Sequence, residues 1–187
     1  AASQVAAMVD HALAHFGRID ILVNNAGSRP GADRVPVLEL GEAAWDKVHN
    51  VNAKGTFLCA QAVARHMVDR GEGGKIVNIA SGRFWMGGPN RLDYSTSKAG
   101  VIGLVKAVGK EYAETGITVN ALAPAAIYTS MLENAEPEAV QYMIERIPMK
   151  RFGKLEELGA TAAWIVSEEA SFNTGFAFDM SGGRATY

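Results

Sequence analysis

The chain has 187 residues and a mass of 19.9 kDa, which is the size of one large domain. Apolar residues make up 48% of it and charged residues 20%, a mixture that excludes intrinsic disorder, collagen and a simple coiled coil. The net charge of −2 leaves no basic excess for binding nucleic acid, and no apolar run approaches the length of a membrane span.

The single cysteine, Cys59, cannot form a disulfide within the chain, and no secretory signal opens the sequence. Both features indicate a reducing compartment. We therefore expect a cytoplasmic protein that binds neither nucleic acid nor a membrane.

Hydrophobic periodicity predicts helices and strands in alternation along the whole chain. Residues 5–16 carry apolar side chains at helical spacing, Gly17 ends that helix, and residues 19–23 form an apolar run typical of a buried strand. A loop over 28–36 follows. The remaining predicted elements are a helix over 42–70 with an irregularity at Gly55, a strand over 75–79, a helix over about 94–114, a strand over 117–122, a helix over 137–146, a helix over 155–168 and a strand over 175–180.

This alternation predicts an α/β fold, a doubly wound parallel sheet in a Rossmann-type three-layer sandwich with right-handed crossovers. Ligands of such sheets bind beyond the carboxyl ends of the strands. Functional residues are therefore expected directly after Val23, Ile79, Leu122 and Met180.

The side chains best suited to chemistry follow the strand that ends at Ile79. Ser81 stands at the strand end, and Tyr94 and Lys98 lie four residues apart on one face of the next helix. A tyrosine has a pKa near 10, and lowering it by about three units costs roughly 4 kcal/mol. A lysine ammonium about 4 Å away supplies roughly that energy at an effective dielectric constant of 20, which makes Tyr94 a candidate general acid/base. The alternative is a packing tyrosine beside a solvated lysine.

Further stretches combine with this constellation. They are Asn24-Asn25-Ala26-Gly27, Asn52 in Val51-Asn52-Ala53-Lys54-Gly55, Tyr94-Ser95-Thr96-Ser97-Lys98, Val119-Asn120-Ala121-Leu122-Ala123-Pro124 with Thr129, and Asp179-Met180-Ser181-Gly182-Gly183. Together these motifs resemble the short-chain dehydrogenase/reductase family, and the resemblance runs along the whole chain.

The resemblance implies hydride transfer between NAD or NADP and a secondary alcohol or the matching ketone. It makes Tyr94 the general acid/base, and Lys98 the group that lowers the pKa of Tyr94 and binds the nicotinamide ribose. Ser81 would orient the substrate oxygen. Asn52 would hold a water that joins Lys98 to solvent, or would serve only as the residue of a helix kink.

The same resemblance implies the cofactor-binding residues. The adenosine-ribose side is assigned to Asn25, Ala26 and Gly27, and the nicotinamide side to Tyr94, Lys98, Pro124, Ile127 and Thr129.

Two departures from the family pattern affect cofactor binding. Ala125 follows Pro124 where the family usually has glycine, so the nicotinamide loop is expected to sit differently. The glycine-rich turn that binds pyrophosphate is absent, so we expect one NAD(P)-binding domain over 1–187 that is incomplete at its N-terminus. The strand over 19–23 would then be an exposed apolar edge, and an isolated 1–187 polypeptide would bind dinucleotide poorly.

Substrate recognition is expected from residues 83–92, from Tyr128 and from a lid within 129–152. Arg83 and Arg91 flank the stretch between Ser81 and Tyr94, and each is either a ligand for a carboxylate or sugar hydroxyl, or a solvated or intersubunit charge. The apolar run 84–86 either lines the site or packs beneath it. The substrate is expected to be a small polar alcohol or ketone, or one derived from a sugar.

By resemblance, helices 42–70 and 94–114 form the contacts of a homodimer or homotetramer. Two other functions remain open. One is a non-catalytic truncated remnant that acts in oligomerisation or as a scaffold. The other is a sugar-nucleotide epimerase or dehydratase, for whose extra substrate domain the short tail after Met180 leaves little room. No metal site is expected, because His11 and His15 have metal-ligand spacing without a third ligand nearby.

Overall fold

The computed structural model of the protein describes residues 1–28, 34–133 and 135–185. The loop predicted over 28–36 and the lid within 129–152 therefore lie partly outside the described residues. The helices and strands are α1 (Ala2–Phe16), β1 (Ile21–Asn24), α2 (Glu42–His49), a π-helical turn (Asn50–Gly55), α3 (Thr56–Arg70), β2 (Gly74–Ile79), α4 (Arg83–Met86), α5 (Leu92–Glu111), β3 (Ile117–Pro124), α6 (Ser130–Glu133), α7 (Pro137–Glu145), α8 (Leu155–Ile165) and β4 (Ala177–Met180), with short 3₁₀ turns at Val37–Glu39, Ala113–Thr115 and Glu168–Ala170.

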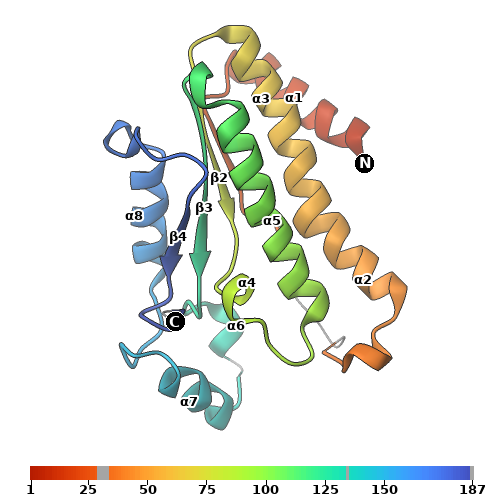
Figure 1. Ribbon diagram of the computed structural model, residues 1–187, viewed down its shortest axis with the longest axis vertical. Coiled ribbons are helices and arrows are strands. Elements are labelled where there is room, and N and C mark those ends of the chain that lie inside the picture. The colour runs from red at the N-terminus through yellow and green to blue at the C-terminus, as the bar shows by residue number, and fades with distance from the viewer. Residues whose placement is uncertain (29–33, 134, 186–187) are drawn as a thin grey trace.

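The strands form one parallel sheet in the order β1-β2-β3-β4, as the alternating pattern predicts. Asparagine side chains join β1 to β2 and β2 to β3. Asn24 Nδ2 donates to Asn78 Oδ1 at 2.9 Å, and Asn78 Nδ2 donates to the carbonyl oxygen of Asn120 at 3.2 Å. β2, β3 and β4 point the same way in Figure 1, with α4, α6 and α7 gathered at their carboxyl ends. The strands thus all end on the same side of the sheet.

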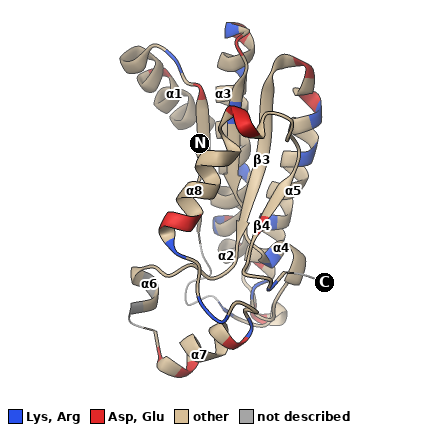
Figure 2. Ribbon diagram, turned by 90° about the vertical axis from the view of Figure 1, so that its left-hand side faces the viewer, with Lys and Arg blue, Asp and Glu red and all other residues tan. Residues whose placement is uncertain are grey.

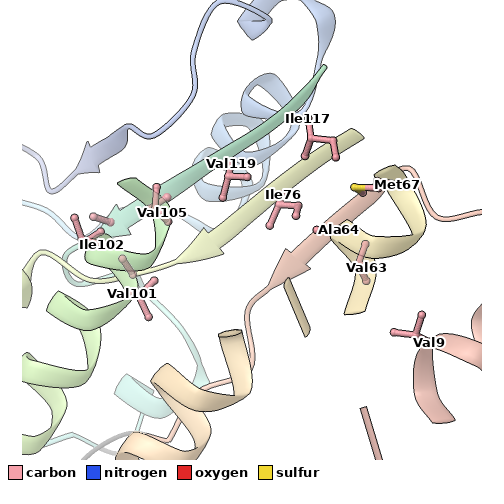
Figure 3. Packing of buried hydrophobic residues seen from close by; sticks show 13 residues of the cluster. Val9, Val63, Ala64, Met67, Ile76, Val101, Ile102, Val105, Ile117 and Val119 are labelled. Atoms are coloured by element: carbon pink, nitrogen blue, oxygen red, sulfur yellow. The ribbon is translucent and has the colours of Figure 1, made fainter. Parts of the chain in front are cut away.

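Helices cover both faces of the sheet. On one face α1, α3 and α5 pack on side chains such as Ile76 and Val119, and Figure 3 shows Ile76 next to Ala64 of α3. On the other face α8 packs on a smaller cluster around Leu122, and Figure 2 shows α8 and α5 on opposite sides of the strands. The three-layer sandwich predicted from the sequence is confirmed.

The position of α8 contradicts one expectation. The chain moves in one direction across the sheet from β1 to β4, yet α8 covers the opposite face from α3 and α5. A crossover on the opposite face has the opposite hand, so the three crossovers cannot all be right-handed. The prediction of right-handed crossovers throughout was wrong, because the apolar pattern of α8 does not say which face of the sheet it covers.

The expected apolar edge is confirmed at β1. Within the described residues this strand pairs only with β2, and Ile21 and Val23 are each 47% exposed. No helix in the part of the chain that the structure describes is long and apolar enough to cross a membrane.

Candidate active site

The carboxyl ends of β2 and β3 are joined directly. The N–H of Gly82 donates to the carbonyl oxygen of Pro124 at 3.0 Å, and the N–H of Ala125 donates to Met180 at the end of β4 at 3.1 Å. Residues that leave three strands are therefore fixed relative to one another. This frame supports the candidate site, as expected for a parallel sheet.

Ser81 and Tyr94 line the same pocket at this edge, which has a volume of about 240 Å³. Helix α5 begins at Leu92 and so presents Tyr94 in its first turn, across from the end of β2. Ser81 is nearly buried, and its Oγ accepts a hydrogen bond from the N–H of Arg83 at 3.3 Å. Since that bond uses an acceptor site, the Ser81 hydroxyl keeps its proton for a ligand.

Lys98 lies one turn further along α5 and is only 5% exposed. Its ammonium donates to the carbonyl oxygen of Ile79 at 2.6 Å and lies 5.9 Å from the centre of the Tyr94 ring. Burial lowers the pKa of Lys98 from 10.5 to about 8. The side chain therefore still carries its charge at neutral pH.

Asn52 lies in the π-helical turn and is 1% exposed. Its Oδ1 accepts the N–H of Ser28 at 2.7 Å, and its Nδ2 donates to the carbonyl oxygen of Ser28 at 2.9 Å and to Ser97 Oγ at 3.0 Å. The side chain thus fastens the loop after β1 to helix α5, a role that the sequence pattern did not suggest. The predicted water between Lys98 and solvent stays a prediction.

The residues after β1 reach the same group. A Cβ atom on Gly27 would lie 3.4 Å from Asn52 Oδ1 and 3.7 Å from Lys98 Nζ. Asn25 and Ala26 precede it and are exposed. The absence of a side chain at Gly27 leaves open space in front of the lysine ammonium.

The loop after β3 forms the wall of a second cavity of about 570 Å³, next to the first. Ile127 and Thr129 line this second cavity, and the loop is held by paired main-chain bonds between Ala126, Tyr128 and Gly153. Of the predicted nicotinamide residues, Tyr94 lines the pocket with Ser81, whereas Ile127 and Thr129 line the neighbouring cavity and not that pocket. Pro124 itself ends β3.

Arg83 and Arg91 line both hollows, as do Arg34 and Arg184, which sequence reasoning missed. Arg184 stands four residues after the end of β4, so its place beyond a carboxyl end was a usable signal. Arg34 carried none. The Tyr128 ring is tilted against that of Phe152, with 6.5 Å between the ring centres, and Tyr128 lines neither hollow.

The sequence left open whether the apolar run 84–86 lines the site or packs beneath it, and the structure shows both. Phe84 and Trp85 pack on the core under α5, whereas Met86 lines the pocket.

Comparison with known proteins agrees with this geometry. A family model described as enoyl-(acyl carrier protein) reductase matches residues 1–185. The (2S)-[(R)-hydroxy(phenyl)methyl]succinyl-CoA dehydrogenase subunit BbsD of Thauera aromatica is 44% identical over 181 residues, which cover 96% of this chain and 71% of that protein. A crystal structure of a putative short-chain alcohol dehydrogenase from Sinorhizobium meliloti 1021 superimposes with a TM-score of 0.91 at 36% identity, covering 98% of this chain and 72% of that one. The chain belongs to the short-chain dehydrogenase/reductase family.

Glucose 1-dehydrogenase 2 of Bacillus subtilis (strain 168) is a further relative, 41% identical over 184 residues, with 98% of this chain and 70% of that protein covered. As a short-chain dehydrogenase/reductase, the protein is an oxidoreductase that uses NAD or NADP and acts on CH–OH groups. The open space at Gly27, beside the ammonium of Lys98, is compatible with such a cofactor.

Metal ligands do not gather in the part of this short-chain dehydrogenase/reductase that the structure describes, since no group of three or more His, Cys, Asp or Glu could hold an ion there. His11 and His15 are both exposed on α1.

Proposed function

We propose that the protein interconverts a secondary alcohol and its ketone, with Tyr94 as the general acid/base and the hydride carried by NAD or NADP. One observation carries the proposal: Tyr94 and Ser81 line one pocket, and the buried ammonium of Lys98 lies beside the tyrosine ring. The single domain over 1–187 would hold all of these groups.

In the reductive direction Ser81 donates its hydrogen bond to the ketone oxygen and stabilises the negative charge that develops there. Tyr94 then gives its proton to that oxygen, and in the oxidative direction it accepts the proton back. When bound, the nicotinamide supplies or accepts the hydride at the carbon. The oxygen thus gains or loses one proton as the carbon gains or loses one hydride.

The ammonium of Lys98 lies 5.9 Å from the centre of the Tyr94 ring, so a positive charge stands beside the group that would give and accept the proton. Its bond to Ile79 fixes the position of the ammonium and leaves two of its three N–H groups for the cofactor ribose.

The cofactor would lie along the edge formed by Asn25, Ala26 and Gly27 on one side and by Pro124, Ile127 and Thr129 on the other. Asn52 holds the first of these loops through Ser28. A water between Lys98 and solvent, held at Asn52, would carry the proton onward.

The substrate would be a small polar or sugar-derived alcohol or ketone. The two relatives above are named for glucose and for a substituted succinyl-CoA, and both names fit a polar pocket of this kind. Arg83, at the pocket wall, would contact the substrate together with Ser81 and Tyr94.

We further propose a cytoplasmic homodimer or homotetramer built through α2, α3 and α5. Val51, Phe57 and Val68 are exposed apolar residues in the π-helical turn and α3, as a subunit contact would require. Sedimentation velocity should find a dimer or tetramer, and a monomer at micromolar concentration would contradict the assembly.

The catalytic proposal is tested by the absorbance of NAD(P)H at 340 nm, with the protein as its gene encodes it and a panel of alcohols, ketones and sugars. Tyr94→Phe should abolish turnover. Tyr112→Phe, which changes a tyrosine just beyond the far end of the same helix, should leave turnover unchanged. Appreciable turnover by the Tyr94 variant would remove its assigned role, and no turnover with any substrate would favour a non-catalytic remnant.

A further inference from the structure

Four arginines from separate segments converge on the candidate site. Arg34 precedes α2, Arg83 begins α4, Arg91 precedes α5 and Arg184 follows β4. All four line both the pocket that holds Ser81 and Tyr94 and the larger cavity beside it. The two hollows are therefore adjoining lobes with a shared wall that carries four guanidinium groups.

None of these four arginines forms an ion pair with a carboxylate among the side chains that the structure describes, which do not include those of Asp33 and Glu133. The ion pairs of the described side chains involve Arg18, Arg70, Lys75 and Arg151, all elsewhere in the fold. Arg83 Nη1 donates to the carbonyl oxygen of Gly87 at 2.8 Å, which holds the side chain in place without cancelling its charge.

The guanidinium groups also affect one another. Burial, followed by the charges of Arg34 and Arg83, lowers the pKa of Arg91, and burial followed by the charge of Arg83 lowers that of Arg184. Arginine remains charged despite such shifts. The fold thus keeps like charges together in a partly dry cavity, an arrangement that an anion would relieve.

Besides the arginines, both lobes share Ala125, Ala126 and Met143, whose side chains carry no oxygen or nitrogen. Hydroxyl groups line the unshared parts of the space, from Ser81 and Tyr94 in the smaller lobe and from Thr129 and Tyr142 in the larger one. Ser81 and Tyr94, the proposed reacting centre, line only the smaller lobe, and Ala139 and Tyr142 of helix α7 line only the larger one.

We propose that the substrate carries an oxyanionic group, a carboxylate or a phosphate, which the cluster of Arg34, Arg83, Arg91 and Arg184 binds while the carbon to be oxidised or reduced lies at Ser81 and Tyr94. This inference rests on the proposed function of that pocket. It makes charge, rather than hydroxyl pattern, the feature by which the enzyme selects its substrate.

Turnover of matched ketones tests the selection. The pairs are 4-oxopentanoate with its methyl ester, and dihydroxyacetone phosphate with dihydroxyacetone, which separate carboxylate from phosphate. The protein as its gene encodes it should favour at least one anion over its neutral partner by tenfold or more in kcat/KM. Arg91→Met and Arg184→Met should each raise the KM for that anion by about tenfold to a hundredfold and raise the KM for the neutral partner by much less.

Arg184→Lys keeps the charge but not the planar guanidinium group. Its KM for the anion should therefore lie between that of the wild type and that of Arg184→Met. The control is Arg18→Met. Arg18 forms an exposed ion pair with Asp20 at the opposite end of the sheet, so its loss should leave kcat/KM unchanged for both the anionic and the neutral ketone. Equal use of anionic and neutral ketones would overturn the proposal and leave the proposed function standing.

Calorimetry with inorganic phosphate and with succinate supplies a readout without turnover. The proposal is supported if an anion binds, if Arg184→Met weakens this binding and if saturating NAD or NADP leaves it unchanged. Binding that the dinucleotide abolishes would assign the arginines to the cofactor and overturn the proposal, as would no binding of either anion. If every ketone failed as a substrate, the proposed function would fail, and this measurement alone would decide whether the cluster binds anions.

Discussion

The ammonium of Lys98 donates to the carbonyl oxygen of Ile79 at 2.6 Å, which ties helix α5 to the last residue of strand β2. This bond holds a nearly buried charge at the edge of the sheet, between the Tyr94 ring and Gly27. The charge costs folding free energy, and the cost depends on pH.

The free energy of unfolding should therefore rise with pH as Lys98 loses its proton. Its pKa is about 8 in the folded protein against 10.5 as a reference, so the unfolded state binds more protons between these values and stability increases as pH rises. Between pH 7.5 and 9.5 the gain is about 2 kcal/mol. Urea unfolding of the wild type and of Lys98→Met at both pH values measures it: the variant should lack this gain, and an identical pH response in both proteins would contradict it.

Asn52→Asp should loosen the loop after β1. The substitution keeps the shape but replaces a donor to the carbonyl of Ser28 and to Ser97 by an acceptor. A buried group with mismatched partners costs about 1–3 kcal/mol, which urea unfolding would register. Asn50→Asp, at an exposed position in the same turn, should change stability by less than about 0.5 kcal/mol. Equal effects at both positions would refute the fastening role.

Gly27→Ala should separate folding from cofactor binding. The new methyl would make ordinary contacts at 3.4 Å from Asn52 Oδ1 and 3.7 Å from Lys98 Nζ, so stability should change by less than about 0.5 kcal/mol. The methyl would, however, occupy the space in front of the ammonium. Fluorescence titration with NADH or NADPH should show binding weakened about tenfold, or about 1.4 kcal/mol. Gly159→Ala, in open space on α8, should bind as the wild type does.

Two glycines of α5 should respond in opposite directions to alanine. At Gly109 a Cβ would lie 2.6 Å from the main-chain nitrogen of Gly175, so the substitution should cost about 1–3 kcal/mol by overpacking. At Gly103 no atom lies within 4 Å, and alanine should stabilise the helix by about 1 kcal/mol. Thermal unfolding of the two variants tests this, and a stabilised Gly109→Ala would show that the turn at Gly175 yields.

The sequence predicts the existence of most elements well and their ends less well, because side chains from elsewhere take over main-chain groups at those ends. The strand expected from Ile19 begins at Ile21, since His66 accepts the N–H of Ile19 and Arg70 donates to its carbonyl. Strand β4 likewise begins two residues late, after Gly175 with its φ of +72° and after Phe176, whose N–H donates to the side chain of Asn120.

Two short helices escaped prediction. Helix α4 begins two residues after Ser81, whose hydroxyl accepts the N–H of Arg83, and Gly87 ends it. A helix of one turn has no periodicity to detect. Helix α6 is equally short.

Part of the candidate site could be predicted from the sequence and part could not. Ser81, Tyr94 and Lys98 lie close in the sequence, so the end of one strand and the spacing of residues on one helix are enough to predict that they lie together. The arginine cluster draws on positions from 34 to 184, and only the meeting of three strand ends makes them neighbours.

The turn from Asn50 to Gly55 contains one residue more than a regular α-helix would need, and Gly55 marks its end. Each residue advances an α-helix by about 100°, so this surplus sets the phase between α2 and α3. Deleting a single residue there would rotate the stripe of Ala60, Val63, Ala64 and Met67 by more than a quarter of a circle relative to Val48. The segment from 42 to 70, which the sequence pattern predicts as one helix, therefore consists of two helices whose buried faces are set independently. The irregular turn between them allows Asn52 to reach its hydrogen-bond partners while the apolar side chains of α3 face the core.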